Sequence, residues 1–156
     1  MKRTLPVLAA LLCLASARAQ EFPLESKSKP APLDWNQEIA SPRSRALEVA
    51  AERKALGYHL RDGFWSGTLE KEKPVLIAVH LFAGNDYWFS AANLDPDTQL
   101  KISLFDRWGN AAGGRESEGH AQATAGISPV RSGRYFVQLE MTEGDKASTC
   151  MVYSYK

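Results

Sequence analysis

Apolar and polar positions alternate through most of the second half of the chain. Residues 87–91 read Tyr-Trp-Phe-Ser-Ala, and residues 100–105 read Leu-Lys-Ile-Ser-Leu-Phe. A period of two is typical of a β-strand with one face on a core. Further short strands are predicted at 64–69, 75–82, 121–127, 135–140 and 148–155, with Gly, Pro, Asn and Asp between them. Short strands at this spacing predict a small antiparallel β-sandwich.

The predicted strand at 75–82 differs from the others, because it reads Val-Leu-Ile-Ala-Val-His-Leu-Phe and is apolar on both faces. Such a run is typical of a strand in the middle of a sheet that is covered on both sides. We therefore expect this strand to be central.

A helix is predicted before the strands, at 41–57. Ser41 is a good N-cap residue, Pro42 fits the first helical position, and Gly57 is a natural C-terminal cap. The apolar side of this helix is mostly alanine. The predicted fold class is thus all-β: an antiparallel sandwich over residues 58–156, preceded by one α-helix.

The N-terminal 40 residues show neither pattern. Residues 1–19 have a basic start, a short apolar run and Ala-Arg-Ala before the end, which predicts a secretory signal peptide cleaved after Ala19. Residues 20–40 are rich in Pro, Ser, Lys and Glu and are interpreted as an extended linker or tail. An exported protein, periplasmic or extracellular, is expected. The apolar run of the signal is too short to favour an uncleaved anchor, and no later segment of the chain is apolar over the length of a membrane span.

The charge and the cysteine content limit the classes of partner and of covalent chemistry to be considered. The chain has 19 basic residues, and removal of Lys2, Arg3 and Arg18 leaves 16 against 18 acidic residues. A nucleic-acid partner is not expected, since such proteins carry a basic excess. Cys150 would be the one cysteine after cleavage, and a buried, unpaired thiol is its simplest interpretation; an intermolecular disulfide is the alternative.

No catalytic arrangement is evident. The histidines His59, His80 and His120 lack metal-ligand spacing, and the nucleophile motif Gly-x-Ser-x-Gly is absent. His59 and Asp62 are close in sequence and could supply part of a catalytic triad, but no nucleophile motif accompanies them. We expect a protein that is not an enzyme.

Three aspartates are weak candidates for a calcium site. Asp95 and Asp97 lie in a predicted loop, and Asp106 follows the next strand. Calcium takes six to eight oxygen ligands. An ordinary turn is the alternative for Asp95 and Asp97. No cofactor is expected, with calcium as the one open alternative.

Aromatic residues are the best lead to a binding surface. Alternation turns Trp88, Phe105 and Phe136 away from the predicted core, and Trp65 and Trp108 would extend that surface from its edges. Exposed aromatic rings stack on sugars or anchor a protein partner. The alternative is that the predicted helix or the linker covers this face.

Four segments follow one another in an order that has a known counterpart: Trp-Ser-Gly-Thr-Leu at 65–69, the strand pair at 81–89, the segment at 97–110, and Ser-Gly-Arg-Tyr-Phe-Val at 132–137. This order resembles the bacterial pre-peptidase C-terminal domain family. The resemblance implies a jelly-roll-like sandwich that is an accessory module of exported proteins, without catalysis. Family members often place paired aspartates after the Gly-Asn turn, whereas residues 111–116 here read Ala-Ala-Gly-Gly-Arg-Glu.

Together these observations predict an exported, non-catalytic module that acts in protein interaction or envelope structure, through a protein partner or self-association. The alternative is a carbohydrate-binding module that presents an aromatic sheet face to a polysaccharide.

Overall fold

The structure, a computed structural model, describes residues 41–156. The predicted signal peptide at 1–19 and linker at 20–40 lie outside the described residues. The helical elements are α2 (Pro42–Ala51) and the 3₁₀ turn η1 (Lys54–Leu56). The strands are β1 (His59–Leu60), β2 (Trp65–Glu70), β3 (Val75–Leu81), β4 (Tyr87–Ala92), β5 (Gln99–Phe105), β6 (Arg115–Ser117), β7 (Gly119–His120), β8 (Gln122–Ile127), β9 (Gly133–Glu143) and β10 (Lys146–Tyr155).

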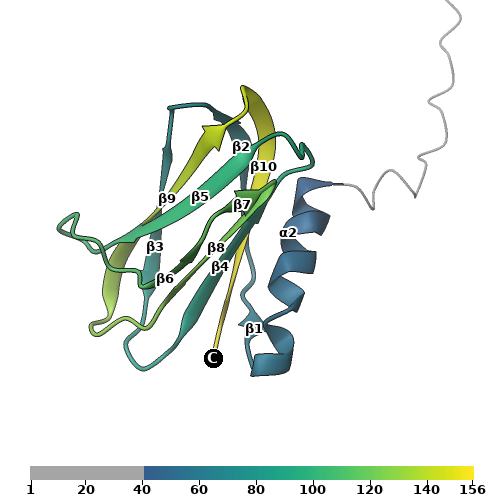
Figure 1. Cartoon of the computed structure of the whole chain (residues 1–156). Helices are drawn as coiled ribbons and strands as arrows, with labels where there is room; N and C mark the ends of the chain where they lie inside the picture. The colour runs from purple at the N-terminus through teal and green to yellow at the C-terminus, as the bar shows by residue number, and fades with distance from the viewer. Residues whose placement is uncertain (1–40) are drawn as a thin grey trace, which may run out of the picture. The chain divides into compact units, whose positions relative to one another are not determined.

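The strands form two antiparallel sheets that pack face to face, which confirms the predicted β-sandwich (Figure 1). One sheet has the order β1-β10-β4-β8-β6, with β2 also paired to β10, and the other has the order β3-β9-β5-β7. From β2 to β10 each strand lies in the sheet opposite its predecessor. The two groups β2-β10-β4-β8 and β3-β9-β5-β7 give the strand order of an eight-stranded jelly roll, with β6 added at one edge.

Alternation sets the core between the sheets. In β5 the inward Leu100, Ile102 and Leu104 are at most 1% exposed, while the side chains between them are half-buried. Tyr87 and Phe89 of β4 and Leu139 of β9 are fully buried in the same core. At 25 cal/mol per Å², each of these large side chains stabilises the fold by about 2–3 kcal/mol.

The helix α2 begins as its sequence predicts. The Ser41 side chain accepts a hydrogen bond from the Ser44 backbone N–H at 3.1 Å, and Pro42 follows at the first position. The α-helix ends earlier than expected, at Ala51, and η1 completes the segment up to Gly57, whose φ is 85°. The next residue, Tyr58, is 6% exposed and bonds to Asp86. This turn brings Tyr58 back to the sandwich.

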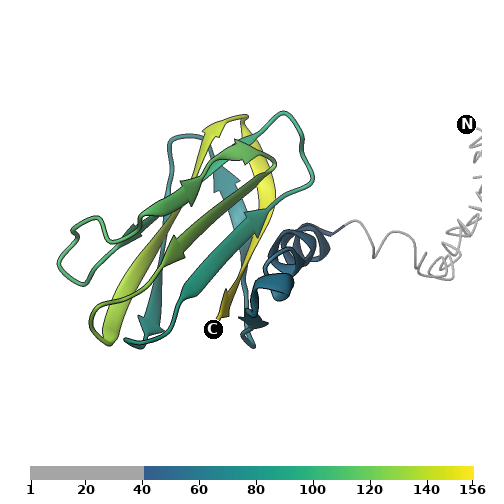
Figure 2. The same ribbon diagram turned by 60° about the horizontal axis from the view of Figure 1, so that its bottom comes forward.

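The prediction for the strand at 75–82 is wrong. β3 is an edge strand, bonded to β9 on one side. One face is directed to the core, but Leu76 is 58% exposed and Ala78 and His80 are also exposed. In a two-layer sandwich only one face of each sheet is covered by the other sheet. Figure 2 shows α2 against the β10-β4-β8 sheet and no helix, among the described residues, on the sheet that contains β3.

Candidate functional site

Trp88 does not form an exposed aromatic surface. It does point to the outer face of its sheet, as alternation predicts, yet it is 7% exposed because α2 packs over that face and Arg53 lies over the ring. The guanidinium carbon of Arg53 lies 3.7 Å from the ring centroid, and that of Arg115 lies 5.3 Å away. The alternative that the helix covers this face is therefore correct for Trp88.

The other aromatic candidates lie in separate places. Phe105 and Phe136 are direct cross-strand neighbours on the outer face of the second sheet, where both are half-buried. Trp65 packs against the core between the sheets. Trp108 lies in the loop after β5 and is 62% exposed. The prediction of one continuous aromatic face is wrong, because the rings come from two different sheets.

The calcium candidates do not converge. Asp95 and Asp97 precede β5 and Asp106 follows it, so the length of the strand, about 20 Å, separates them. Asp95 accepts a hydrogen bond from the Asp97 backbone N–H, and Asp106 accepts bonds from the backbone N–H groups of Trp108 and Asn110. Among residues 41–156, no cluster of three His, Cys, Asp or Glu side chains could hold a metal ion.

The histidines do not assemble a catalytic site in the part of the chain that the structure describes. His59 is exposed on β1, and His80 lies on the outer face of β3 with its ring 5.0 Å from that of Phe82. No hydrogen bond joins either residue, within 41–156, to a serine or a cysteine. Cys150 is fully buried beneath α2, and burial raises the pKa of its thiol, so the thiol is protonated at neutral pH.

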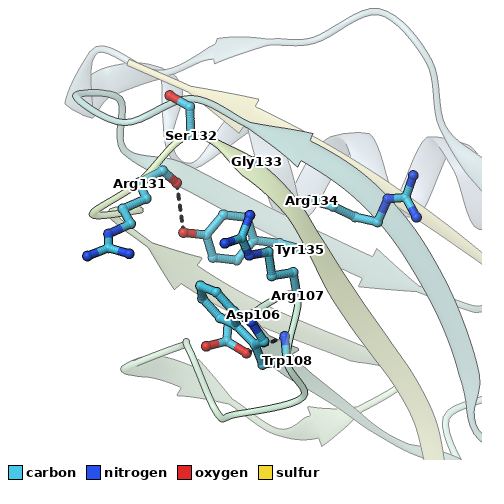
Figure 3. Close-up of a pocket in the computed structure, with 8 residues that line it drawn as sticks. All are labelled: Asp106, Arg107, Trp108, Arg131, Ser132, Gly133, Arg134 and Tyr135. Carbon is cyan, nitrogen blue, oxygen red and sulfur yellow. Dashed lines mark hydrogen bonds between the residues drawn. The ribbon is translucent and has the colours of Figure 1, made fainter.

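A small cleft lies at one end of the sandwich, and we call it the loop-end cleft (Figure 3). It is lined by Asp106, Arg107 and Trp108 from the loop after β5, and by Arg131, Ser132, Gly133, Arg134 and Tyr135 from the start of β9 and the loop before it. A shallower groove beside it shares Trp108 and Tyr135 and continues to Val130, which is 90% exposed.

Hydrogen bonds within each loop fix the walls of the cleft. The Asp106 carboxylate accepts from the Trp108 and Asn110 backbone N–H groups at 2.9 Å, which holds Trp108 in its turn. Across the cleft, the Tyr135 hydroxyl donates to the Arg131 carbonyl oxygen at 2.9 Å. The loop before β9 is also tied to the loop after β3, because the Ala83 backbone N–H donates to the Ser132 hydroxyl.

The cleft combines an exposed ring with positive charge. The guanidinium of Arg107 stacks on Trp108 at 4.0 Å. Arg131 and Arg134 are also exposed, and Figure 3 shows Arg134 extending away from the group around Tyr135. Among the described residues, no ion pair neutralises any of these three arginines. Asp106 is directed to its own loop, where hydrogen bonds, first of all from the Asn110 side chain, lower its pKa and keep it ionised.

Asp86 anchors the same end of the molecule. Its carboxylate accepts hydrogen bonds from the Tyr58 and Ser128 hydroxyls and from the Arg115 guanidinium. Burial raises the pKa of Asp86, but these bonds outweigh burial and lower it to about 2. Asp86 thereby ties the segment after η1, β6 and the loop before β9 to the start of β4.

The sequence pattern alone did not point to the arginines or to the role of Asp86. Arg107, Arg131, Arg134 and Asp86 all lie between the predicted strands, where the pattern assigns them no function. Arg107 and Arg131 are 24 positions apart, and only the fold brings their loops together. One signal was available: both loops pair arginine with an aromatic residue, Arg107 with Trp108 and Arg134 with Tyr135.

Comparisons with known proteins give no family. No protein-family model matches the chain, and no curated protein is similar to it in sequence. Among solved structures, PliG of Aeromonas hydrophila, a periplasmic inhibitor of g-type lysozyme, is similar with a TM-score of 0.47 and 15% sequence identity, over 65% of this chain and 90% of the inhibitor. A likeness this distant carries no argument about function. The resemblance to the pre-peptidase C-terminal domain family stays a prediction.

Proposed function

We propose that the protein is an exported, non-catalytic binding module whose loop-end cleft recognises an acidic segment of a protein partner. The observation that carries the proposal is Trp108, which is 62% exposed and stacked with Arg107 at the lip of the cleft. Large exposed rings beside arginine are the residues that dominate binding energy at protein interfaces. A free monomer gains nothing from leaving such a ring in water.

The charge of the cleft selects the chemistry of the partner. Arg107 and Arg131 have no ion-pair partner among the described residues, and guanidinium groups bind carboxylates through two parallel hydrogen bonds. An acidic segment with an apolar residue beside it would satisfy the arginines and cover Trp108 and Val130 together.

Site-specific photo-crosslinking tests this proposal. A photoreactive amino acid at position 130, which is 90% exposed beside the cleft, should capture a discrete protein in the native host. The matched control is the same group at position 94, in the loop between β4 and β5 at the opposite end, where Leu94 is 49% exposed.

The variant Trp108→Ala should reduce the product formed at position 130 at least about tenfold, as loss of a dominant interface residue does. Since Trp108 is exposed, this variant should unfold at the same temperature as wild type. Equal capture by positions 130 and 94, or capture that Trp108→Ala leaves intact, would show that the cleft is not the binding surface.

A carbohydrate-binding role is a second candidate, and one observation favours it. Phe105 and Phe136 lie side by side on the outer face of the second sheet, which no helix of residues 41–156 covers and where aromatic rings can stack on sugars. Saturable binding to an insoluble polysaccharide that Phe136→Ala weakens, and Trp108→Ala does not, would support this role over the first.

A further inference from the structure

The strand β3 leaves one edge of its sheet open. In the order β3-β9-β5-β7 it is bonded to β9, and within residues 41–156 no other strand pairs with it (Figure 1). In an antiparallel ladder about half of the backbone N–H and C=O groups of an edge strand point away from its neighbour. Val75–Leu81 therefore presents a row of backbone donors and acceptors to the surroundings.

The remaining edges are protected by the means that natural sheets use. β7 and β1 are two residues long, and β6 is three residues long and carries Arg115 and Glu116. β2 has six residues but includes Gly67 and ends in Glu70. β3 has none of these features: its seven residues include no charge and no proline, and its pairing with β9 is regular.

The side chains of β3 are also incompletely covered. Val75, Ile77 and Val79 point to the core but remain only partly buried, because no strand continues the sheet beyond them. On the other face Leu76 is 58% exposed. A strand added at this edge would bury both sets of side chains and pair the free backbone groups in one step.

We propose that β3 pairs with β3 of a second copy, antiparallel about a twofold axis at Ala78. The two four-stranded sheets would then form one continuous sheet across the dimer. In this register residue 78 faces residue 78 of the second copy, 77 faces 79, 76 faces 80, and 75 faces 81. All seven residues of the strand are paired, which is the longest pairing that the strand allows.

A second copy fits this edge in three respects. The register aligns inward residues with inward residues, so both cores continue across the axis. Every facing pair is apolar or neutral, and no like charges oppose each other across the axis. The two copies of the strand have the same length, so no residue of either strand is left unpaired. The proposal is independent of the loop-end cleft, since neither surface includes residues of the other.

Sedimentation equilibrium of the protein expressed from the full chain tests the proposal. Wild type should be dimeric at about 100 μM, where a micromolar dissociation constant gives nearly complete association. Ala78→Lys should be monomeric, because it places two ammonium groups opposite each other at the axis. Ala78 is exposed, so this variant should unfold like wild type. Thr68→Lys adds the same charge at an exposed position of β2 and should remain dimeric.

Disulfide formation tests the register itself, in a Cys13→Ala background where the remaining Cys150 is buried. Facing Cα atoms in an antiparallel pair are about 4.5–5.5 Å apart, within the range of a disulfide. Ala78→Cys should therefore cross-link two copies under mild oxidation. Leu76→Cys should not, because its counterpart is four positions away along the partner strand, about 13 Å.

Three results would overturn the proposal. A wild-type protein that is monomeric at all concentrations has no such dimer, whether or not another protein's strand adds to β3. A dimer that survives Ala78→Lys uses a different surface. Cross-linking of Leu76→Cys as efficient as that of Ala78→Cys contradicts the register.

Discussion

The absence of a side chain at Gly126 leaves space for the Trp88 ring on the outer face of the sheet. Gly126 of β8 pairs directly with Trp88, and a Cβ built on it would lie 2.3 Å from two ring carbons. Trp88 Nε1 has no hydrogen-bond partner among the described residues, so packing and the guanidinium groups of Arg53 and Arg115 hold the ring.

Gly126→Ala should therefore lower the free energy of unfolding by about 1–3 kcal/mol, the usual cost of overpacking. Urea denaturation measures it. Gly114→Ala is the matched control: its Cβ would meet no atom within 4 Å and its φ is not positive, so a change within about 0.5 kcal/mol is expected. Equal effects of the two variants would contradict the close packing of Trp88 on β8.

Asp86 makes stability depend on pH in the acid range. Its pKa is about 2 in the folded protein, below the ordinary value of 3.8, so the unfolded chain binds the proton more readily. The carboxylate therefore contributes stability that is complete above about pH 4–5 and is lost as pH falls towards 2. The shift corresponds to about 2 kcal/mol.

Asp86→Asn should be about 2 kcal/mol less stable than wild type near neutral pH, and the difference should shrink to near zero at about pH 2. Urea unfolding at a series of pH values measures both limits. Asp145→Asn, at an exposed aspartate without a side-chain ion pair in the described region, should show no such trend. A difference between Asp86→Asn and wild type that persists at pH 2 would mean that the side chain stabilises by shape rather than charge.

At the scale of elements, local patterns predict what depends on neighbours in sequence. Alternation located β2 to β5 and β8 to β10, and Ser41 and Pro42 located the start of α2. It missed β1, β6 and β7, which are only two or three residues long and too short to show a period. The same patterns predicted a central position for β3, which is an edge strand. A strand that is apolar on both faces fits a covered central position and an edge that pairs with another chain equally well. The sequence left open whether Trp88 is exposed or covered by the helix or the linker, because a strand pattern does not show what packs over it.

The alternation of side chains along a strand also does not show to which sheet the strand belongs. Phe105 and Trp88 both point outward as expected, but from opposite sheets, so they cannot share a surface. The loop-end cleft also depends on strand pairing, since its two arginine-bearing loops meet because β5 and β9, far apart in the sequence, are neighbours in one sheet.

The packing of α2 rests on small residues rather than on area. Ala46 and Ala50 contact Ala92, Cys150 and Val152 on the outer face of the sheet. An alanine interface allows close approach but adds little burial per residue. The close fit of small side chains therefore holds α2 on the sheet. A single large or charged side chain at the centre of this interface should separate the helix from the sheet.

Ala46→Glu should detach α2, because Ala46 is fully buried and a larger, charged side chain there would have to be taken out of water. In the Cys13→Ala background, Cys150 should then react with a thiol reagent under native conditions, whereas it is protected in the parent. Ala51→Glu changes an exposed position of the same helix and should leave Cys150 protected. Protection retained in Ala46→Glu would show that the sheet, not the helix, shields the thiol.

At the scale of the whole molecule, strand order creates the binding end. Because each strand from β2 to β10 crosses to the other sheet, the connections lie at the two ends of the sandwich. The loops after β3, β5 and β8 share one end, and the Asp86–Ser128 and Ala83–Ser132 hydrogen bonds join the loops after β3 and β8. The strands therefore hold these loops in a fixed arrangement around Trp108.

The chain as a whole carries a net charge of only +1, so its overall field does not steer an acidic partner. Attraction has to come from the local pair of Arg107 and Arg131. Exposed charges are screened within about 8 Å at physiological salt and within less at higher salt. Capture by a photoreactive group at position 130 should thus fall several-fold as salt rises from about 0.1 to 0.5 M.

The double variant Arg107→Ala/Arg131→Ala should capture less partner at low salt and show a flatter salt dependence, because the charges that salt screens are gone. Lys71→Ala/Lys73→Ala removes two charges from the β2–β3 turn at the far end and should keep the wild-type dependence. Capture that is unaffected by salt in wild type would mean that Trp108 and Val130 bind an apolar partner. The arginines would then serve to hold Trp108 in place rather than to recognise carboxylates.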